Sequence, residues 1–357
     1  GPSTIKPSRS NKEAGQNITV KVVVGNDVVL DEVKVTDENG MIVLDKIASE
    51  IYLISARHEE DSYYTEAESE IIVGAGTYSD LRNDINNGEI TKSLYRYVEG
   101  DGDTIEITSS GVIDGKGAVV DMSGSGIRAL KISSSGVTIN NFTFKNAKFN
   151  GDGGAIYSYS SSSGAAYNID IINCNFINNT VNKKGGAIYF DNKGSVDVVN
   201  CTFINNSAFE WGGAIMLDSG NVINCSFTNN KAGYGGAMHV SSQIITNCSF
   251  TNNSANAGGA IFVESISDYG VNNCSFIDNS ADNYGGAIYF YCRSGHVSDS
   301  VFIGNNASDG SAIFFAEAGD NAISNSILLN NRANVEKDSP LNIIVNENNI
   351  VIEFKGR

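Results

Sequence analysis

The sequence predicts an all-β protein, most of which is a stack of short parallel strands, and three observations lead to this prediction. A Gly-Gly-Ala-Ile motif returns at intervals of 23 to 32 residues, a motif related to Asn-Cys-Ser-Phe-x-Asn-Asn follows it, and a short β-branched run lies between the two. Repeats of this length are typical of solenoids, and the many Gly, Asn and Ser turns leave no room for a helix in the unit. The first motif begins at Gly153, Gly185, Gly212, Gly235, Gly258, Gly285 and, as Gly-Ser-Ala-Ile, at Gly310.

Each repeat is expected to form one coil of three short strands, and each strand pairs with its equivalents in the neighbouring coils. The result is a right-handed parallel β-helix of about ten rungs, on the order of 45–50 Å long at ~4.8 Å per rung. The paired glycines supply a sharp bend and a close backbone approach, and the turn asparagines tolerate the left-handed conformation. The second motif should stack an apolar residue inside the coil, at Phe176, Phe203, Phe227, Phe250, Phe276, Phe302 and Leu328.

The solenoid is expected to occupy residues 77–357 and to begin with a capping helix over residues 77–88. Thr77 or Ser79 can act as the N-cap, and Gly88 can end the helix. Such a helix would cover the unpaired backbone of an open solenoid end. At the other end, residues 343–354 still alternate like a strand, so either the last strands cap the solenoid or the chain is cut from a longer protein.

A different module is expected to precede the solenoid. Short alternating runs and a turn signal at 37–40 predict a small Ig-like β-sandwich over residues 16–73. Residues 1–15 are expected to be a disordered linker. The linker opens Gly1-Pro2-Ser3 without a methionine, which is typical of the remnant of a protease cleavage site.

Composition excludes several classes of function. The 357 residues carry a formal net charge of −17, which leaves no basic face for nucleic acid. No apolar run approaches the roughly 18 residues of a membrane helix, so no membrane insertion is expected. Equivalent repeat positions hold five of the six cysteines, which favours a buried column of free thiols over disulfides or a metal site. These five are Cys174, Cys201, Cys225, Cys248 and Cys274.

The strongest candidate for a functional surface is the column of residues that follows the core isoleucine. In Ala-Ile-Tyr-Phe the strand period of two places Ile and Phe inside and Tyr outside. An exposed strip of aromatic and acidic groups is typical of a binding face, whereas the alternative is that stacked rings only stabilise the sheet. The candidate residues are Tyr157, Tyr189, Trp211, Tyr234, His239, Phe262, Tyr284 and Tyr289, with the acidic residues Asp191, Asp218 and Glu264.

The acidic residues form a column of their own, beside the aromatic one. Asp191 and Asp218 are expected on adjacent rungs, where close like charges raise a pKa or recruit a cation. The alternative is an ordinary solvated face, since serine and tyrosine occupy other positions of the same column.

These motifs resemble two groups of surface proteins. The pairing of Gly-Gly-Ala-Ile with Phe-x-x-Asn is similar to the polymorphic membrane proteins of chlamydiae. The chain resembles still more the adhesin-like surface proteins of methanogenic archaea, which share the Tyr78-Ser-Asp-Leu81 helix start, the Ile113-Asp-Gly-Lys-Gly117 segment and the Val137 to Phe144 run. Their Ig-like repeats also match Asn39-Gly40, Tyr52 to Ile54 and Asp61 to Tyr64.

The resemblance implies an extracellular adhesin displayed on a cell surface, which binds a microbial or host cell-surface protein or glycan, and we expect a monomer. A passive structural spacer and a polysaccharide-cleaving enzyme are the alternatives. Such enzymes need paired carboxylates at a fixed separation or a calcium cluster with a basic residue. The three histidines lie in unrelated contexts and no nucleophile elbow occurs, so we expect no catalytic residue, no metal site and no cofactor.

Overall fold

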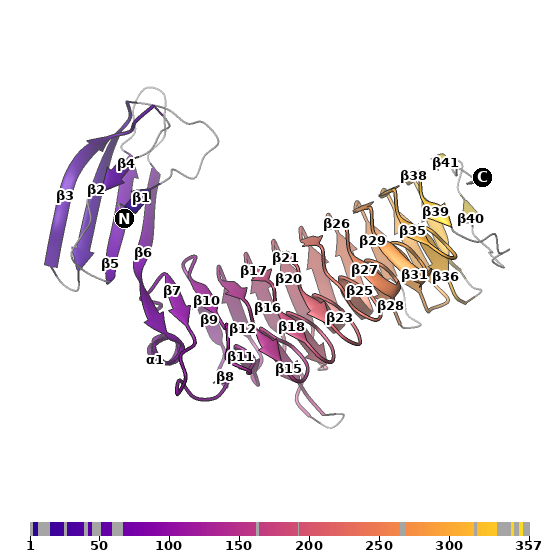
Figure 1. The fold of residues 1–357 in the computed structure, drawn as a ribbon, viewed down its shortest axis with the longest axis horizontal. Helices are drawn as coiled ribbons and strands as arrows, with labels where there is room; N and C mark the ends of the chain where they lie inside the picture. Colours follow the sequence, from indigo (N-terminus) through magenta and orange to yellow (C-terminus); the bar gives the residue numbers. More distant parts are fainter. Residues whose placement is uncertain are drawn as a thin grey trace. The chain divides into compact units, whose positions relative to one another are not determined.

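The computed structural model describes residues 3–5, 15–24, 27–38, 42–44, 51–58, 67–161, 164–191, 193–264, 269–317, 320–333, 344–345 and 350–352. The described elements are almost entirely β-strands, with one short helix (Figure 1). They fall into two compact units, residues 1–95 with 116–118 and residues 96–115 with 119–357.

The first unit is built on an antiparallel sheet with the strand order β3-β2-β5-β6. Its small core lies on Val20 and Val22 of β2, Ile42 and Leu44 of β4, and Ile54 of β5. The strands of this unit are β1 (Ser3–Ile5), β2 (Asn17–Val24), β3 (Asp27–Val35), β4 (Ile42–Leu44), β5 (Ile51–His58) and β6 (Ala67–Thr77), and the boundary between the units falls within β7 (Leu94–Arg96).

Two expectations for this unit have different outcomes. Residues 3–5 were expected in a disordered linker, but they form β1, which pairs antiparallel with β4. The β-branched Thr4 and Ile5 favour a strand where a partner strand is available. An Ig-like sandwich stays a prediction, since much of the expected sequence match, Asn39-Gly40 and Asp61 to Tyr64, lies outside the described residues.

The predicted helix is present as α1 (Tyr78–Asn87). Thr77 is its N-cap and forms a capping box with Asp80, in which each side chain accepts the backbone N–H of the other residue. Gly88 ends the helix in the left-handed conformation, with a φ of 77°. The capping residues in the sequence therefore predicted both ends of the helix correctly.

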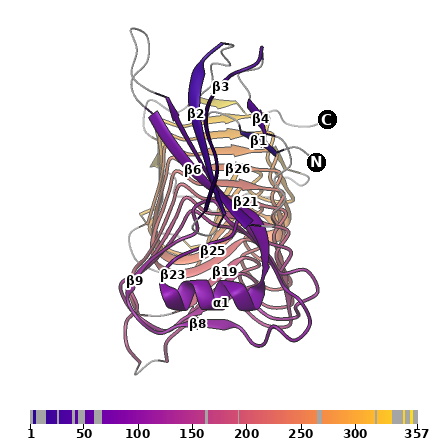
Figure 2. The ribbon, with the colours of Figure 1, turned by 90° about the vertical axis from the view of Figure 1, so that its left-hand side faces the viewer.

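The second unit is a parallel β-solenoid of about nine turns, close to the expected number. Figure 2 looks along the stack, so equivalent strands lie behind one another. The strands that carry the core phenylalanines, or another apolar residue in their place, pair in sequence and in register. They are β10 (Val119–Asp121), β13 (Thr143–Lys145), β17 (Asn175–Ile177), β21 (Thr202–Ile204), β24 (Ser226–Thr228), β26 (Ser249–Thr251), β30 (Ser275–Ile277), β34 (Val301–Ile303), β38 (Ile327–Leu329) and β41 (Ile350–Ile352).

A second long sheet holds the other two positions of each coil. The strands that follow the Gly-Gly motif, or that occupy the equivalent place, are β8 (Ile105–Ile107), β11 (Leu130–Ile132), β15 (Ile156–Tyr159), β19 (Ile188–Asp191), β28 (Ile261–Val263), β32 (Ile288–Phe290) and β36 (Ile313–Phe315). The strands of the β-branched run are β9 (Gly111–Asp114), β12 (Val137–Asn140), β16 (Ile169–Ile172), β20 (Val196–Val199), β29 (Tyr269–Asn272), β33 (Gly295–Ser298), β37 (Ala322–Ser324) and β40 (Ile344–Val345). Two long strands run through both positions, β23 (Ile215–Ile223) and β25 (Met238–Thr246).

Short strands line the turn that leads into the Gly-Gly motif. One set consists of β14 (Lys148–Phe149), β18 (Thr180–Val181) and β22 (Ser207–Ala208), and the other of β27 (Ser254–Ala257), β31 (Ser280–Tyr284), β35 (Asn306–Ala307) and β39 (Arg332–Ala333).

The interior consists of columns of identical side chains, as the repeat predicts. Phe176, Phe203, Phe227 and Phe250 stack with ring centroids 4.7 to 4.8 Å apart and nearly parallel planes. All six cysteines are buried and free, and in the repeat column the backbone N–H of Cys225 donates to the Sγ of Cys248 at 3.4 Å. The predicted thiol column is therefore confirmed.

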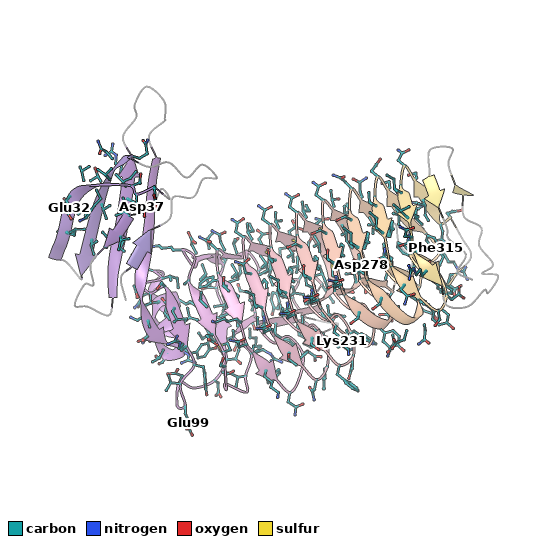
Figure 3. All side chains as sticks on the ribbon, turned by 45° about the horizontal axis from the view of Figure 1, so that its top comes forward. Glu32, Asp37, Glu99, Lys231, Asp278 and Phe315 are labelled. Atoms are coloured by element: carbon teal, nitrogen blue, oxygen red, sulfur yellow. The ribbon has the colours of Figure 1, made fainter. Side chains whose placement is uncertain are left out.

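Asparagine forms two kinds of ladder in the turns. One is buried: the side chain of Asn253 accepts the backbone N–H of Asn230 and donates to the carbonyl oxygen of Phe227. The other is exposed and left-handed, with φ between 49° and 61° where asparagine holds it, except at Asn325. Asp278, labelled in Figure 3, takes the place of asparagine in this exposed ladder. The sequence predicted the exposed ladder, because asparagine tolerates the left-handed conformation in turns. It did not predict the buried ladder.

The two glycines of the motif have separate roles. Gly212 has a φ of 63°, a conformation that favours glycine. Gly213 lies so close to the next coil that a Cβ would fall on the carbonyl oxygen of Gly236. The motif is therefore required by the backbone of the coil.

Candidate functional site

The candidate site is built on the outer face of the strands that follow the Gly-Gly motif, where side chains stand out from every coil (Figure 3). Strand alternation turns the isoleucines inward and the next residue outward. We call these outward residues the ring column, and the strand register places them on successive coils. The ring column consists of Tyr157, Tyr189, Met216, His239, Phe262, Tyr289 and Phe314.

The rings of this column stack along the solenoid axis. Tyr157 and Tyr189 are 5.4 Å apart between centroids and nearly parallel. Met216 interrupts the series, and a second run continues with centroid separations of 5.1 Å from His239 to Phe262 and 4.8 Å from Phe262 to Tyr289. The stacking expected of equivalent positions is therefore present, and it stabilises the sheet whether or not the face binds anything.

A continuous exposed strip was expected, but part of the ring column is buried. Tyr189, Met216 and His239 are only 6%, 7% and 1% exposed. Polar partners make this burial possible, because the hydroxyl of Tyr189 donates to Asp191 at 3.0 Å and the Nε2 of His239 lies 3.3 Å from Glu264. The remaining rings of the column are half-buried.

A second column covers the first. The residue before each Gly-Gly pair bridges to its equivalent in the next coil, and we call this series the turn column. Each of its aromatic residues leans over the ring column of the following coil, so that Trp211 stacks on His239 at 4.7 Å and Tyr234 meets Phe262 edge-on at 5.4 Å. The turn column consists of Lys184, Trp211, Tyr234, Ala257, Tyr284 and Asp309.

The two ends of the site differ in exposure. Near the first coils, the cation of Lys184 lies 3.8 Å from the centre of the Trp211 ring, and Arg128 lies 4.0 Å from the centre of Tyr157. These contacts cover the rings from outside. Near the later coils, Tyr234 and Tyr284 remain 44% and 43% exposed, so the accessible rings of the turn column lie there.

The acidic column behaves as expected at its first two members. Phe190 pairs with Leu217, which places Asp191 and Asp218 on adjacent coils. Burial raises the pKa of Asp218, and the neighbouring Asp191 raises it further, while a hydrogen bond with Ser241 opposes the shift. Asp218 therefore holds its proton more readily than an ordinary surface carboxyl.

His239 is the least ordinary group of the site. Burial lowers its pKa to about 3, and the positive charge of Lys184 lowers it in addition. Among the described residues, its Nδ1 is the one buried side-chain nitrogen or oxygen without a hydrogen-bond partner. The ring is therefore neutral near pH 7 and sits between the rings of Trp211 and Phe262.

Sequence reasoning missed three contributors. Arg128 and Lys184 cover rings of the site. Tyr291 is 51% exposed, and its ring centroid lies 6.3 Å from that of Tyr289. Lys184 precedes Gly185 as Trp211 precedes Gly212, so alignment of the repeats could have found it. Arg128 lies before the first Gly-Gly pair, and no repeat signal marks it.

No group of three or more His, Cys, Asp or Glu side chains that could hold a metal occurs in the part of the chain that the structure describes. In the same part, no helix is long and apolar enough to cross a membrane.

Comparisons with known proteins agree with this architecture. Residues 186–350 match the family model of the right-handed beta helix region, and residues 173–191 match the repeat of the Chlamydia polymorphic membrane protein. No curated protein and no solved structure matches the chain. The structure and the first match together define an all-β repeat protein with a right-handed parallel β-helix, as predicted. The second match confirms the predicted similarity to the chlamydial repeats, over one coil.

Proposed function

We propose that this chain is an adhesin of a cell surface, which binds a microbial or host cell-surface protein or glycan and catalyses no reaction. The observation that carries the proposal is the group of half-exposed tyrosines that covers the ring column at the later coils. Monomeric proteins seldom leave contiguous aromatic surface in water without a use for it. The match to a repeat of a chlamydial membrane protein supports placement outside the cell, and the resemblance to methanogen adhesins suggests an archaeal cell.

A stiff repetitive scaffold suits this role. The side chains of each coil are fixed by hydrogen bonds and stacking with both neighbours, so little conformational entropy is lost when a partner binds. The high negative charge keeps the protein soluble and disfavours nucleic acid or other polyanions as partners.

The proposal is tested by cell-binding and glycan-array assays on the chain and a triple variant with Tyr234, Tyr284 and Tyr291 changed to Ser. These positions are 43% to 51% exposed, so the fold should tolerate the change. Phe209→Ser is the matched control, because Phe209 is 79% exposed and none of the described ring contacts involves it. We expect the triple variant to lose binding and the control to keep it. Equal binding by all three proteins would leave the spacer function as the better account.

One observation favours an enzyme as the second candidate. Burial and the neighbouring Asp191 raise the pKa of Asp218, and a carboxyl with a raised pKa beside a second carboxyl is the catalytic arrangement of many glycosidases. An assay for new reducing ends on polysaccharides, with Asp191→Asn and Asp218→Asn as controls, decides the point. Release of reducing ends by the chain and not by either variant would establish the enzyme.

A further inference from the structure

The turn column has a gap in its series of rings. Tyr234, Ala257 and Tyr284 occupy equivalent positions on three successive coils. Ala257 offers only a methyl group between two half-exposed tyrosines. The two tyrosines are two coils apart, which is about 9–10 Å along the axis. This separation is close to the length of a disaccharide unit in an extended chain of six-membered sugar rings.

Tyrosine hydroxyls gather around this gap. The ring centroid of Tyr289 lies 6.1 Å from that of Tyr284 and 6.3 Å from that of Tyr291. Tyr234 contacts Phe262, whose ring stacks on Tyr289. None of the four tyrosine hydroxyls has a hydrogen-bond partner among the described residues, whereas the hydroxyl of Tyr189 donates to Asp191. A phenolic hydroxyl both donates and accepts, as the hydroxyls of a sugar do.

The local charge selects among saccharides. Glu264 and Asp282 are exposed beside the tyrosines, and Asp309 is half-exposed in the turn column itself. With a net charge of −17 on the chain, uronic or sialic acid units would be repelled. A neutral saccharide meets no such barrier.

A protein partner fits this surface less well. The exposed parts of Tyr234, Tyr284 and Tyr291 amount to roughly 350 Å², taking ~250 Å² for a whole tyrosine side chain. A stable protein interface needs about 800 Å² from each partner, so a protein would also have to cover the exposed carboxylates of Glu264 and Asp282. A single polysaccharide chain is narrow, so it can bind by contacts with the rings of the turn column alone.

We propose that Tyr234 and Tyr284 bind a neutral, extended polysaccharide of six-membered rings along the solenoid axis. The inference rests on the proposed function and names its ligand class. Alternate sugars of such a chain present the same face, so one sugar stacks on Tyr234 and the next but one on Tyr284. The sugar between them passes over Ala257, and the free hydroxyls of Tyr289 and Tyr291 bond with the hydroxyls of the chain.

The test is calorimetric titration of the full chain with three probes: cellohexaose, chitohexaose and oligogalacturonate. We expect at least one neutral hexasaccharide to bind and the anionic oligomer not to bind. Tyr234→Ala and Tyr284→Ala should each weaken the affinity by about 2- to 13-fold, the range of aromatic contact energies. Ala257→Tyr should weaken it too, because a ring would then occupy the path of the middle sugar. Phe209→Ala should bind as the unchanged chain does.

The failures are distinguishable from one another. If no neutral oligosaccharide binds, or if the tyrosine variants bind it equally well, the polysaccharide inference is overturned. When Tyr234→Ala and Tyr284→Ala nonetheless abolish attachment to cells or to a surface protein, the adhesin proposal survives that failure. Attachment that is unaffected by these variants, together with no saccharide binding, overturns both.

Discussion

Acidification from pH 7 to pH 5 should destabilise the solenoid through His239. The imidazole is 1% exposed and lies between the rings of Trp211 and Phe262. Protonation would place a positive charge in this stack, with Lys184 above Trp211 adding repulsion. The pKa of His239 is therefore lower in the folded protein than in the unfolded chain.

The size of the effect follows from the pKa. Burial lowers the pKa of His239 from 6.5 to about 3. Because the folded value is the lower one, the unfolded chain takes up the proton first as the pH falls. The stability that the neutral ring contributes is complete above about pH 6.5 and is lost progressively towards pH 3. At pH 5, which is about 1.5 units below the pKa of the unfolded histidine, the free energy of unfolding has fallen by about 2 kcal/mol.

The assay is urea unfolding at several pH values between 7 and 5, followed by the fluorescence of Trp211, the one tryptophan of the chain. In His239→Phe the ring column continues with a group that does not titrate, so its free energy of unfolding should change by about 2 kcal/mol less than that of the unchanged chain. Glu264 lies 3.3 Å from Nε2 and favours the protonated ring, but the folded pKa of about 3 is already well below pH 5. Glu264→Gln should therefore leave the pH dependence between pH 7 and pH 5 unchanged. The same pH dependence in the chain and in His239→Phe would refute this reasoning.

Substitutions at three further sites test the columns of the solenoid, two by chemical unfolding and one by hydrogen exchange. Asn253→Ala removes the acceptor of a buried backbone N–H, which should cost about 2–3 kcal/mol, and an unchanged midpoint would contradict the ladder. Phe227→Ala opens a cavity in the stacked core and should cost about 3–5 kcal/mol, whereas Phe227→Leu should cost clearly less. Gly213→Ala forces apart two coils at the carbonyl oxygen of Gly236, so it should reduce amide protection from hydrogen exchange in both coils. Full protection in that variant would show that the coil can relax.

Much of the fold could be predicted because every coil of a solenoid repeats the same sequence motif. In each copy of Gly-Gly-Ala-Ile the first position is left-handed and the second lies close to the backbone of the next coil. Glycine is the residue that suits both positions. The inward phenylalanines and cysteines followed from strand alternation, and the helix from its capping residues. The first unit was harder, because its few strands have no repeat to confirm their bounds and β1 lay in an expected linker.

The candidate site could be predicted in its columns but not in its exposure. Strand alternation was enough to predict that Tyr189, His239 and Phe262 lie on the outer face, since successive side chains point to opposite faces of a strand. Their exposure to water depends on packing between coils, because side chains from the turn of the preceding coil cover them, as Trp211 covers His239. Such cover depends on how side chains from different coils lean together, and neither period nor composition encodes that. The accessible tyrosines of the turn column are Tyr234 and Tyr284, which Ala257 and Asp309, not rings, follow on the next coil.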